Sequence, residues 1–256
     1  MRTRALRVGI GVLGIALGLL VWDLYARAQE TQLFVPTVAA TAAALRRLLT
    51  SGEFWAAYRE TLVPFLYGWL LAVVAGVGAG LAVGRLRVID GLTKPYVAFL
   101  NALPVSTLIP IVVIVFGIGI AARTSVVFLF AFIEVLLTTA AGARRIDASI
   151  MEMTRSFQAP AWRRFRRVIV PGSLPAILAG IRVGTARAVV GMVVMELLLV
   201  SVGVGLLLSR YKDTFRSPEL YAVVVSLAIF GLLLQGVLRR IEAKALRWRP
   251  VAWGEP

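Results

Sequence analysis

The chain has 256 residues, of which 59% are hydrophobic, and its mean hydropathy is +0.86. Soluble domains are about half apolar or less, so this excess indicates a lipid-facing surface. Histidine and cysteine are absent, which excludes disulfides, thiolate nucleophiles, imidazole bases and most zinc sites. A net charge of +15 suggests nucleic acid binding in a soluble protein. Here the basic residues flank apolar runs, so we expect contact with membrane lipids and neither nucleic acid nor metal.

Six apolar runs approach the length of about 20 residues that a helix needs to cross a bilayer. Backbone groups in lipid must form hydrogen bonds within the chain, so we predict helices rather than open strands. The predicted fold is an all-α membrane protein, a polytopic bundle of about six transmembrane helices. The predicted spans are residues 8–25, 62–84, 96–116, 124–142, 174–200 and 220–238.

The basic residues also predict the orientation of the bundle. With the N-terminus inside, the inner segments hold 18 Lys and Arg residues, and the outer segments hold eight. Cytoplasmic loops carry an excess of these residues, so we predict a cytoplasmic N-terminus. The predicted inner segments are 1–7, 85–95, 143–173 and 239–256.

The first span has an alternative interpretation. Residues 1–28 are predicted to form an N-terminal transmembrane helix, but Ala26-Arg27-Ala28 also fits the cleavage site of a signal peptide. The long apolar run favours the transmembrane helix. Residues 29–61 are predicted to lie at the outer surface as an interfacial segment, with a helix starting near Pro36 and a break at Ser51-Gly52.

The second span has glycine at every fourth position on one helix face, at Gly76, Gly80 and Gly84. Small residues at this spacing let two membrane helices approach closely. This pattern predicts helix packing, either within the chain, which we favour, or against a second copy.

The third span contains Pro95, Pro104 and Pro110. Proline removes a backbone donor and clashes with the preceding turn, so this helix should be kinked or broken. Interrupted membrane helices often line the cavity through which a substrate passes. A packing irregularity without function is the alternative.

Charged residues also occur inside the predicted spans, namely Glu134, Arg182, Arg187 and Glu196. A charge at the bilayer centre costs about 2.5–3.5 kcal/mol, so such side chains usually face protein, water or a partner. Arg182 is near enough to the inner face to reach it along the helix. Arg187 and Glu196 are about 13.5 Å apart along a helix and should not pair with each other, so one of them could meet Glu134 or a second copy of the chain. Arg187 could instead attract an anionic solute, although we favour structural pairing. The candidates for a translocation path or for intramembrane pairing are Pro104, Pro110, Glu134, Arg187 and Glu196.

The segment between the fourth and fifth spans is basic and partly amphipathic. Ser149 and Glu152 fit a capping box at the start of a short helix, and Pro160 fits the start of a second helix. Trp162, Phe165 and Ile169 then recur at helical spacing, flanked by arginines. Apolar groups in such a pattern can enter the headgroup boundary while the arginines reach anionic lipid.

This segment resembles the EAA loop, E-A-A-x3-G-x9-I-x-L-P, of the permeases of type I ABC importers. Glu152 matches the glutamate, Met153 and Thr154 the two alanines, and Gln158 the glycine. Val168, Val170 and Pro171 match the closing isoleucine, leucine and proline. The resemblance covers nearly the whole chain. Within this family, the chain looks most like the nitrate/sulfonate/taurine (aliphatic sulfonate-type) permease group. The supporting stretches are Leu103-Pro104, Leu108-Ile-Pro110, Phe116-Gly-Ile-Gly119, Val193-Val-Met-Glu196 and Leu246-Arg-Trp248-Arg.

The resemblance implies a MetI-like type I ABC importer fold and a transport subunit of the bacterial cytoplasmic (inner) membrane, not an enzyme. It implies two ABC ATPase subunits, a second permease copy forming a homodimer, and an extracytoplasmic solute-binding protein. The chain has no G-x-x-x-x-G-K-[ST] loop, so ATP and Mg are expected on the ATPase and no cofactor on this chain. The solute would be small and anionic, moved inward by alternating access. The permease core would be residues 62–238 with a coupling loop at about 143–173, and residues 239–256 a basic cytoplasmic tail. The implied ATPase-coupling residues are Ser149, Glu152, Met153, Thr154, Phe157, Gln158, Val168, Val170 and Pro171.

Several positions depart from the family pattern. A glycine in the EAA loop can adopt a left-handed backbone, which would cost Gln158 about 1 kcal/mol or more. Met153 and Thr154 are bulkier than alanine. Glu134 stands where relatives often have proline, and Gln235 where aspartate is common. These departures predict an ATPase contact of non-standard shape, and a degenerate, regulatory or inactive paralogue is the alternative.

A secondary transporter or channel without an ATPase partner is the main alternative. Such proteins often have inverted repeats with paired broken helices, and the sequence shows neither. A membrane enzyme would need clustered catalytic groups, whereas the 13 acidic residues are scattered.

Overall fold

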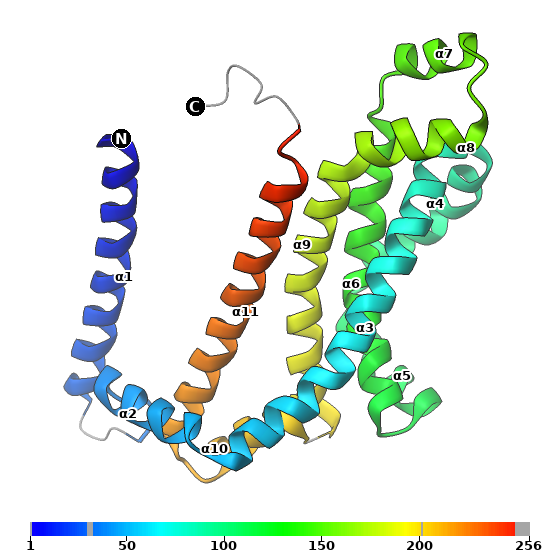
Figure 1. Cartoon of the computed structure of the whole chain (residues 1–256). Helices are drawn as coiled ribbons and strands as arrows, with labels where there is room; N and C mark the ends of the chain where they lie inside the picture. Colours follow the sequence, from blue (N-terminus) through cyan, green and yellow to red (C-terminus); the bar gives the residue numbers. More distant parts are fainter. Residues whose placement is uncertain (1, 30–32, 201, 249–256) are drawn as a thin grey trace. The chain divides into compact units, whose positions relative to one another are not determined.

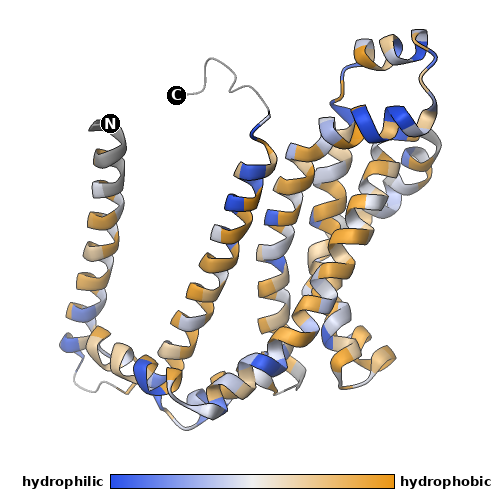
Figure 2. Cartoon of the chain, viewed as in Figure 1, coloured by the Kyte–Doolittle hydropathy of each residue, from blue (hydrophilic) through white to orange (hydrophobic). Residues whose placement is uncertain are grey.

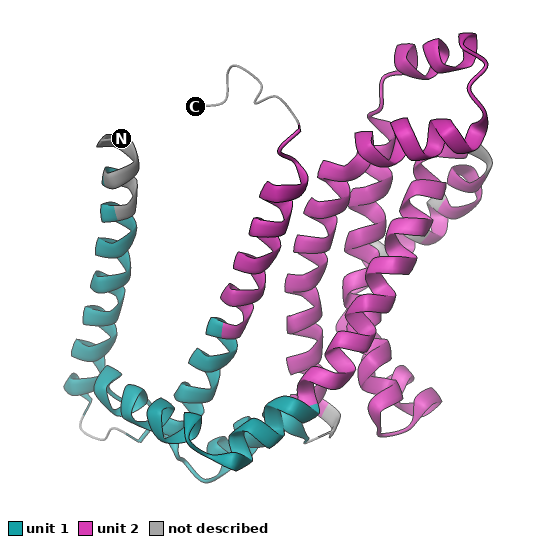
Figure 3. Ribbon diagram, in the orientation of Figure 1, with its two compact units in different colours: residues 1–60, 201–229 teal, residues 61–200, 230–256 magenta. Residues whose placement is uncertain are grey.

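The computed structural model describes residues 2–29, 33–200 and 202–248, and the regular structure in these ranges is entirely helical (Figure 1). The predicted all-α fold is therefore confirmed. Residues 249–256 of the predicted basic tail lie outside the described residues. The chain divides into two compact units, residues 1–60 with 201–229 and residues 61–200 with 230–256 (Figure 3).

Unit 1 joins the N-terminal helix to the short helix α2. It contains α1 (Arg2–Ala28), α2 (Val38–Leu49), α10 (Gly203–Asp213) and the first parts of α3 (Gly52–Arg85) and α11 (Ser217–Ala245). The Thr37 side chain caps α2 by accepting a hydrogen bond from the Ala40 amide at 3.2 Å. Asp23 of α1 accepts from the Val38 amide at 3.1 Å. These contacts hold the beginning of α2 against the end of α1.

Unit 2 is built around α6 (Ile120–Arg144), which packs closely against α3 and against α9 (Val170–Met195). A Cβ atom added to Gly80 of α3 would lie 2.7 Å from the Thr139 Cβ of α6. A Cβ atom added to Gly184 of α9 would lie 2.8 Å from the Val135 Cγ2 of α6. Only glycine permits both approaches, so the backbones of three helices lie in direct contact.

The glycines that the sequence singled out therefore face α6 of the same chain. Added Cβ atoms at Gly76 and Gly84 would also lie less than 3 Å from α6 atoms. Further toward the other end of these helices, Phe65 of α3, Val127 of α6 and Met192 of α9 form a buried cluster.

Five helices among the described residues are long and apolar enough to cross a membrane. Hydrophobic residues run along α3, α6 and α9, and hydrophilic residues gather around α7 (Ala148–Ser156) and α8 (Ala161–Arg164) (Figure 2). The five spans are Gly9–Ala28, Gly52–Arg85, Ile120–Arg144, Ala161–Leu198 and Ser217–Ala245.

The third predicted span, residues 96–116, is not a continuous helix. Helix α4 (Arg87–Ala102) ends before Pro104, a 3-10 turn follows at Val105–Leu108, and α5 (Ile109–Phe116) is a separate short helix. Leu103 and Pro104 are extended, because proline disfavours the helical conformation of the preceding residue and cannot donate to the previous turn. Pro110 stands at the beginning of α5, where a missing amide costs nothing. The expected break is present, and it splits the span in two.

The fifth span starts earlier than predicted. Instead of beginning near residue 174, the helical run begins at Ala161 and continues through a π-helical turn at Phe165–Ile169 (η2) into α9. It changes direction between α8 and α9 (Figure 1), as expected where a π-turn and prolines interrupt the α-helical ladder. The basic segment is thus continuous with a membrane helix.

Substituting Gly80 by alanine should destabilise the protein by about 1–3 kcal/mol, because the new methyl group overlaps Thr139 and the Leu136 carbonyl oxygen. Gly78→Ala is the matched control in the same helix, since its Cβ would meet nothing within 4 Å. It should be neutral or stabilising by up to about 1 kcal/mol through helix propensity. Thermal unfolding of the detergent-solubilised variants measures both. Equal stabilities would contradict the close α3–α6 contact.

Candidate functional site

The segment between α6 and α9 forms a short helix, α7, capped at both ends. At its N-terminus the carboxylate of Asp147 accepts a hydrogen bond from the Ser149 amide at 2.9 Å, and this bond lowers the pKa of Asp147. The lowered pKa means that the cap is complete above the ordinary pKa of aspartate and is lost as the pH falls through the folded-state value. The predicted capping box is wrong, because Asp147 rather than Ser149 is the N-cap residue.

The C-terminus of α7 ends in a Schellman motif. The Ala159 amide donates to the Thr154 carbonyl at 3.1 Å, and the Gln158 amide donates to the Arg155 carbonyl at 2.8 Å. This motif needs a left-handed residue after the helix, and Gln158 has φ 49°. Gln158, which the sequence comparison with the EAA loop matched to a glycine, therefore adopts the backbone conformation for which glycine is suited.

Helix α7 exposes most of its apolar side chains. None of the residues Ala148–Ser156 is buried. Met153 is 53% exposed and Phe157, just beyond the helix, is 79% exposed. Figure 1 shows α7 set apart from the ends of α3, α6 and α9. Exposed apolar groups on a separate, capped helix are typical of a surface that contacts another protein.

The second part of the segment anchors α7 to unit 2. Pro160 precedes α8 as its N-cap residue. Phe165 and Val170 pack against a cluster of Leu81, Ala143, Ile169 and Ile177, and Trp162 stacks on Phe165 with ring centroids 5.7 Å apart. Met151 of α7 joins the same cluster.

The predicted coupling residues thus fall into two groups. Ser149, Glu152, Met153, Phe157 and Gln158 are exposed on or beside α7, and Thr154 is half-buried. Val168, Val170 and Pro171 are half-buried in the helical run that carries the loop back into the bundle. The first group is available for contact with another protein. The second group belongs to the helical run that supports α7.

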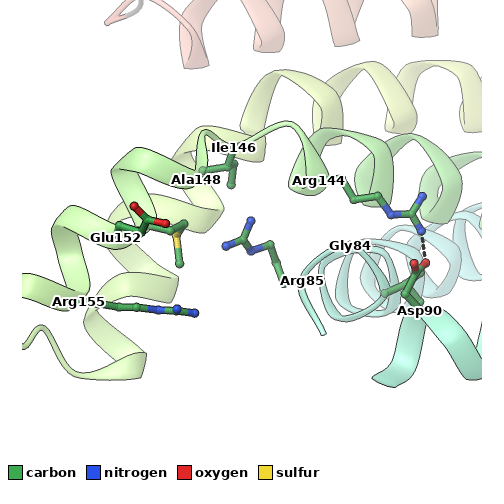
Figure 4. Close-up of a pocket in the computed structure, with 10 residues that line it drawn as sticks. Gly84, Arg85, Asp90, Arg144, Ile146, Ala148, Glu152 and Arg155 are labelled. Carbon is green, nitrogen blue, oxygen red and sulfur yellow. Dashed lines mark hydrogen bonds and ion pairs between the residues drawn. The ribbon is translucent and has the colours of Figure 1, made fainter. Parts of the chain in front are cut away.

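A cleft of about 640 Å³ separates α7 from the ends of α3 and α6. Figure 4 shows Glu152 and Arg155 of α7 facing it from one side and Arg85 from the other. Arg144 forms an ion pair with Asp90 on the far wall. The Arg85 guanidinium donates to the Ala143 carbonyl at 3.3 Å. The cleft is therefore polar and predominantly cationic.

A second site brings together three of the five residues proposed for the translocation path. Arg187 of α9 donates to the Glu134 carboxylate of α6 at 3.1 Å. This pair lines a cavity of about 300 Å³ that also includes Pro104 at the break between α4 and α5. The predicted meeting of Glu134 with one of the fifth-span charges is therefore observed, and it lies beside the interrupted helix.

The other two residues lie elsewhere. Pro110 does not line that cavity. Glu196 is 1% exposed and accepts hydrogen bonds from the Thr61 hydroxyl at 2.8 and 3.0 Å. It therefore joins α3 to the end of the fifth span.

The sequence did not indicate the partners of Arg182 and Gln235. Arg182 forms an ion pair with Glu242 of α11 at 3.3 Å, rather than reaching the membrane surface alone. The Gln235 amide donates to the Arg182 carbonyl at 3.0 Å. Both interactions join α9 to α11. They depend on how the two helices pack, which the spacing of apolar residues in the sequence does not predict.

The chain matches known membrane transport proteins. The family model for the inner membrane component of binding-protein-dependent transport systems matches residues 72–247. A probable ABC transporter permease protein of Brucella abortus strain 2308 is 26% identical over 249 residues, covering 97% of this chain and 99% of that protein. The taurine transport system permease protein TauC of Escherichia coli K12 is 26% identical, covering 96% and 91%.

Two further matches are a putative sulfonate transport permease and a chain of a solved transporter structure. The putative aliphatic sulfonates transport permease protein SsuC of Bacillus subtilis 168 is 27% identical, covering 84% of this chain and 78% of that protein. A chain of the inward-facing methionine ABC transporter MetNI superposes with a TM-score of 0.60 at 20% identity, covering 79% of this chain and 98% of that one. The expected MetI-like, type I ABC importer fold is confirmed.

Gln158→Gly should stabilise the end of α7 by about 1 kcal/mol, because glycine adopts a left-handed backbone without the Cβ penalty. Amide hydrogen exchange of residues 154–159 should slow by about five-fold. Ala159→Gly is the control, since Ala159 does not have a positive φ. If Gln158→Gly exchanges as fast as the original chain, the left-handed assignment is wrong.

Proposed function

This chain belongs to the inner membrane components of binding-protein-dependent transport systems, and we propose that it moves a small anionic solute inward under the drive of a separate ATPase. It is a membrane permease subunit of an ABC importer, a transport component rather than an enzyme. We further propose a homodimer with two ATPase subunits that bind ATP and Mg, and an extracytoplasmic solute-binding protein. The proposed location is the bacterial inner membrane, with the N-terminus and α7 on the cytosolic side.

The observation that carries the coupling proposal is the form of α7. A helix with a cap at each end and no buried residue gains little stabilisation from packing against the rest of its own chain. Its exposed Met153 and Phe157 provide apolar area for a cleft on the ATPase. Phe165 and Val170 anchor the following stretch in unit 2, so a displacement of α7 would be passed to α9.

The proposed transport cycle follows from this connection. ATP binding would draw two ATPase subunits together, and the α7 helices of two permease copies would move with them. Because α9 carries Arg187 and packs on α6, such movement would alter the cavity beside Pro104. The cavity would then open alternately to either side of the membrane.

The anionic solute class rests on the Arg187 guanidinium. A guanidinium donates paired hydrogen bonds to oxyanions, and Arg187 is 61% exposed although it pairs with Glu134. An ion pair this exposed contributes little stability. An anion entering the 300 Å³ cavity could therefore take the place of the Glu134 carboxylate. The names of the sulfonate and taurine relatives agree with a solute bearing an acidic group.

Replacing both Met153 and Phe157 by serine should reduce ATP-driven uptake at least ten-fold, because these side chains supply the apolar contact with the ATPase. The amount of ATPase that copurifies with the tagged permease should fall in parallel. Arg163→Gln and Arg166→Gln in the neighbouring exposed stretch are the controls and should retain uptake. Full uptake by the serine variant at normal membrane levels would refute the coupling role of α7.

Arg187→Gln should lower uptake of small anions at least ten-fold, whereas Glu134→Gln should retain uptake or raise it, because it frees the guanidinium. Proteoliposomes with the ATPase and binding protein, tested with taurine and an alkane sulfonate, provide the measurement. A purely structural pair would make the two variants equally defective, which would contradict solute binding by Arg187 and leave the ATPase coupling intact.

A further inference from the structure

A mostly apolar groove of about 450 Å³ runs along the end of α3 that lies next to the cleft. Gly78, Leu81 and Ala82 of α3 line it together with Phe165 and Ile169 of η2 and Met151 of α7. A Cβ atom added at Gly78 would meet nothing within 4 Å. The groove is therefore open beside Gly78, on an apolar stretch of α3.

Three arginines line the same groove, namely Arg85 of α3, Arg155 of α7 and Arg164 of α8. Arg85 and Arg164 are half-buried, and Arg155 is exposed. Among the described residues that line the groove, none is acidic. Half-buried cations beside apolar surface lose part of their hydration, so they favour an anion that replaces it.

The groove continues into the cleft of Figure 4, with which it shares Arg85, Met151 and Arg155. Two carboxylates line the cleft, Glu152 and Asp90. Asp90 is neutralised by its ion pair with Arg144. Glu152 alone then opposes three arginines, and the shared mouth remains cationic.

We propose that this groove binds one anionic phospholipid. The phosphate lies among Arg85, Arg155 and Arg164, and an acyl chain lies along α3 over Gly78. The charge and the apolar walls together select this occupant, because a soluble anion gains nothing from the walls and an apolar helix gains nothing from the arginines. The groove also lies where the hydrophobic stretch of α3 meets the hydrophilic region around α7 and α8 (Figure 2).

The bound lipid connects α7 to the membrane helices. Arg155 and Met151 belong to α7, whereas Arg85 and Gly78 belong to α3. A phosphate held by arginines from both elements restrains α7 against the bundle. Anionic lipid therefore slows the movement of α7 away from the bundle. This effect does not depend on the identity of the transported solute.

The permease, purified with the subunits that it retains, is reconstituted in nanodiscs of dioleoylphosphatidylcholine with or without dioleoylphosphatidylglycerol. Native mass spectrometry measures the retained phosphatidylglycerol, and hydrogen exchange measures protection of residues 148–156. Arg164→Gln should weaken retention about five-fold. Arg163→Gln is the matched control, since Arg163 is an exposed neighbour that does not line the groove, and it should retain the lipid. Equal loss in both variants would mean diffuse attraction to the membrane surface and would overturn the site.

A second variant separates a lipid from a soluble anion. Gly78→Leu fills the place of the acyl chain without meeting a neighbouring atom at its Cβ, so it should abolish retention while thermal stability is preserved. Phosphatidylglycerol should also protect α7 in the original chain but not in this variant. Retention that survives Gly78→Leu, or that inorganic phosphate displaces, would assign the arginines to a soluble anion. Retention by the permease alone but not by the intact transporter would assign the groove to a subunit contact. Each of these results would overturn the proposal.

Discussion

The close approach of α3 and α9 to the two sides of α6 is the constraint on which unit 2 depends. Lipid tails are as apolar as the helices, so burial of apolar area provides little drive for association within a bilayer. Contact between backbones supplies dispersion and weak polar interactions instead. Gly80 of α3 and Gly184 of α9 make such contact with α6 possible. The ends of α6 and α9 are then held side by side, and the segment that joins them must project as a compact loop.

This projection explains the form of α7. The helix leaves α6 after Arg144, is capped by Asp147, and returns through Pro160 into a helical run that is continuous with α9. Its two sides have different surroundings. Met151 packs inward on the cluster around Leu81, whereas Met153 is exposed. One helix can therefore contact a partner protein on its outer side and respond to a bound lipid on its inner side.

The charges inside the spans show how the helices are joined in addition to their close packing. Glu196 accepts hydrogen bonds from Thr61, and Arg182 pairs with Glu242. Each interaction links two helices, so Glu196 and Arg182 each have a partner from another part of the chain. The Arg187–Glu134 pair differs because it is more exposed and borders a cavity at the broken helix. That difference separates a proposed solute contact from the purely structural pairs.

The sequence alone determined the helical class, most of the apolar spans and the break at Pro104, because these follow from composition, length and local backbone chemistry. The left-handed backbone expected at Gln158 is likewise local. Tertiary structure alone decided which residues meet. Asp147 rather than Ser149 caps α7, the fifth span begins at Ala161, and Arg187 meets Glu134 across 53 residues. The Arg187–Glu134 contact depends on how α6 and α9 rotate and cross, which is decided by glycine-mediated packing between segments that are distant in sequence.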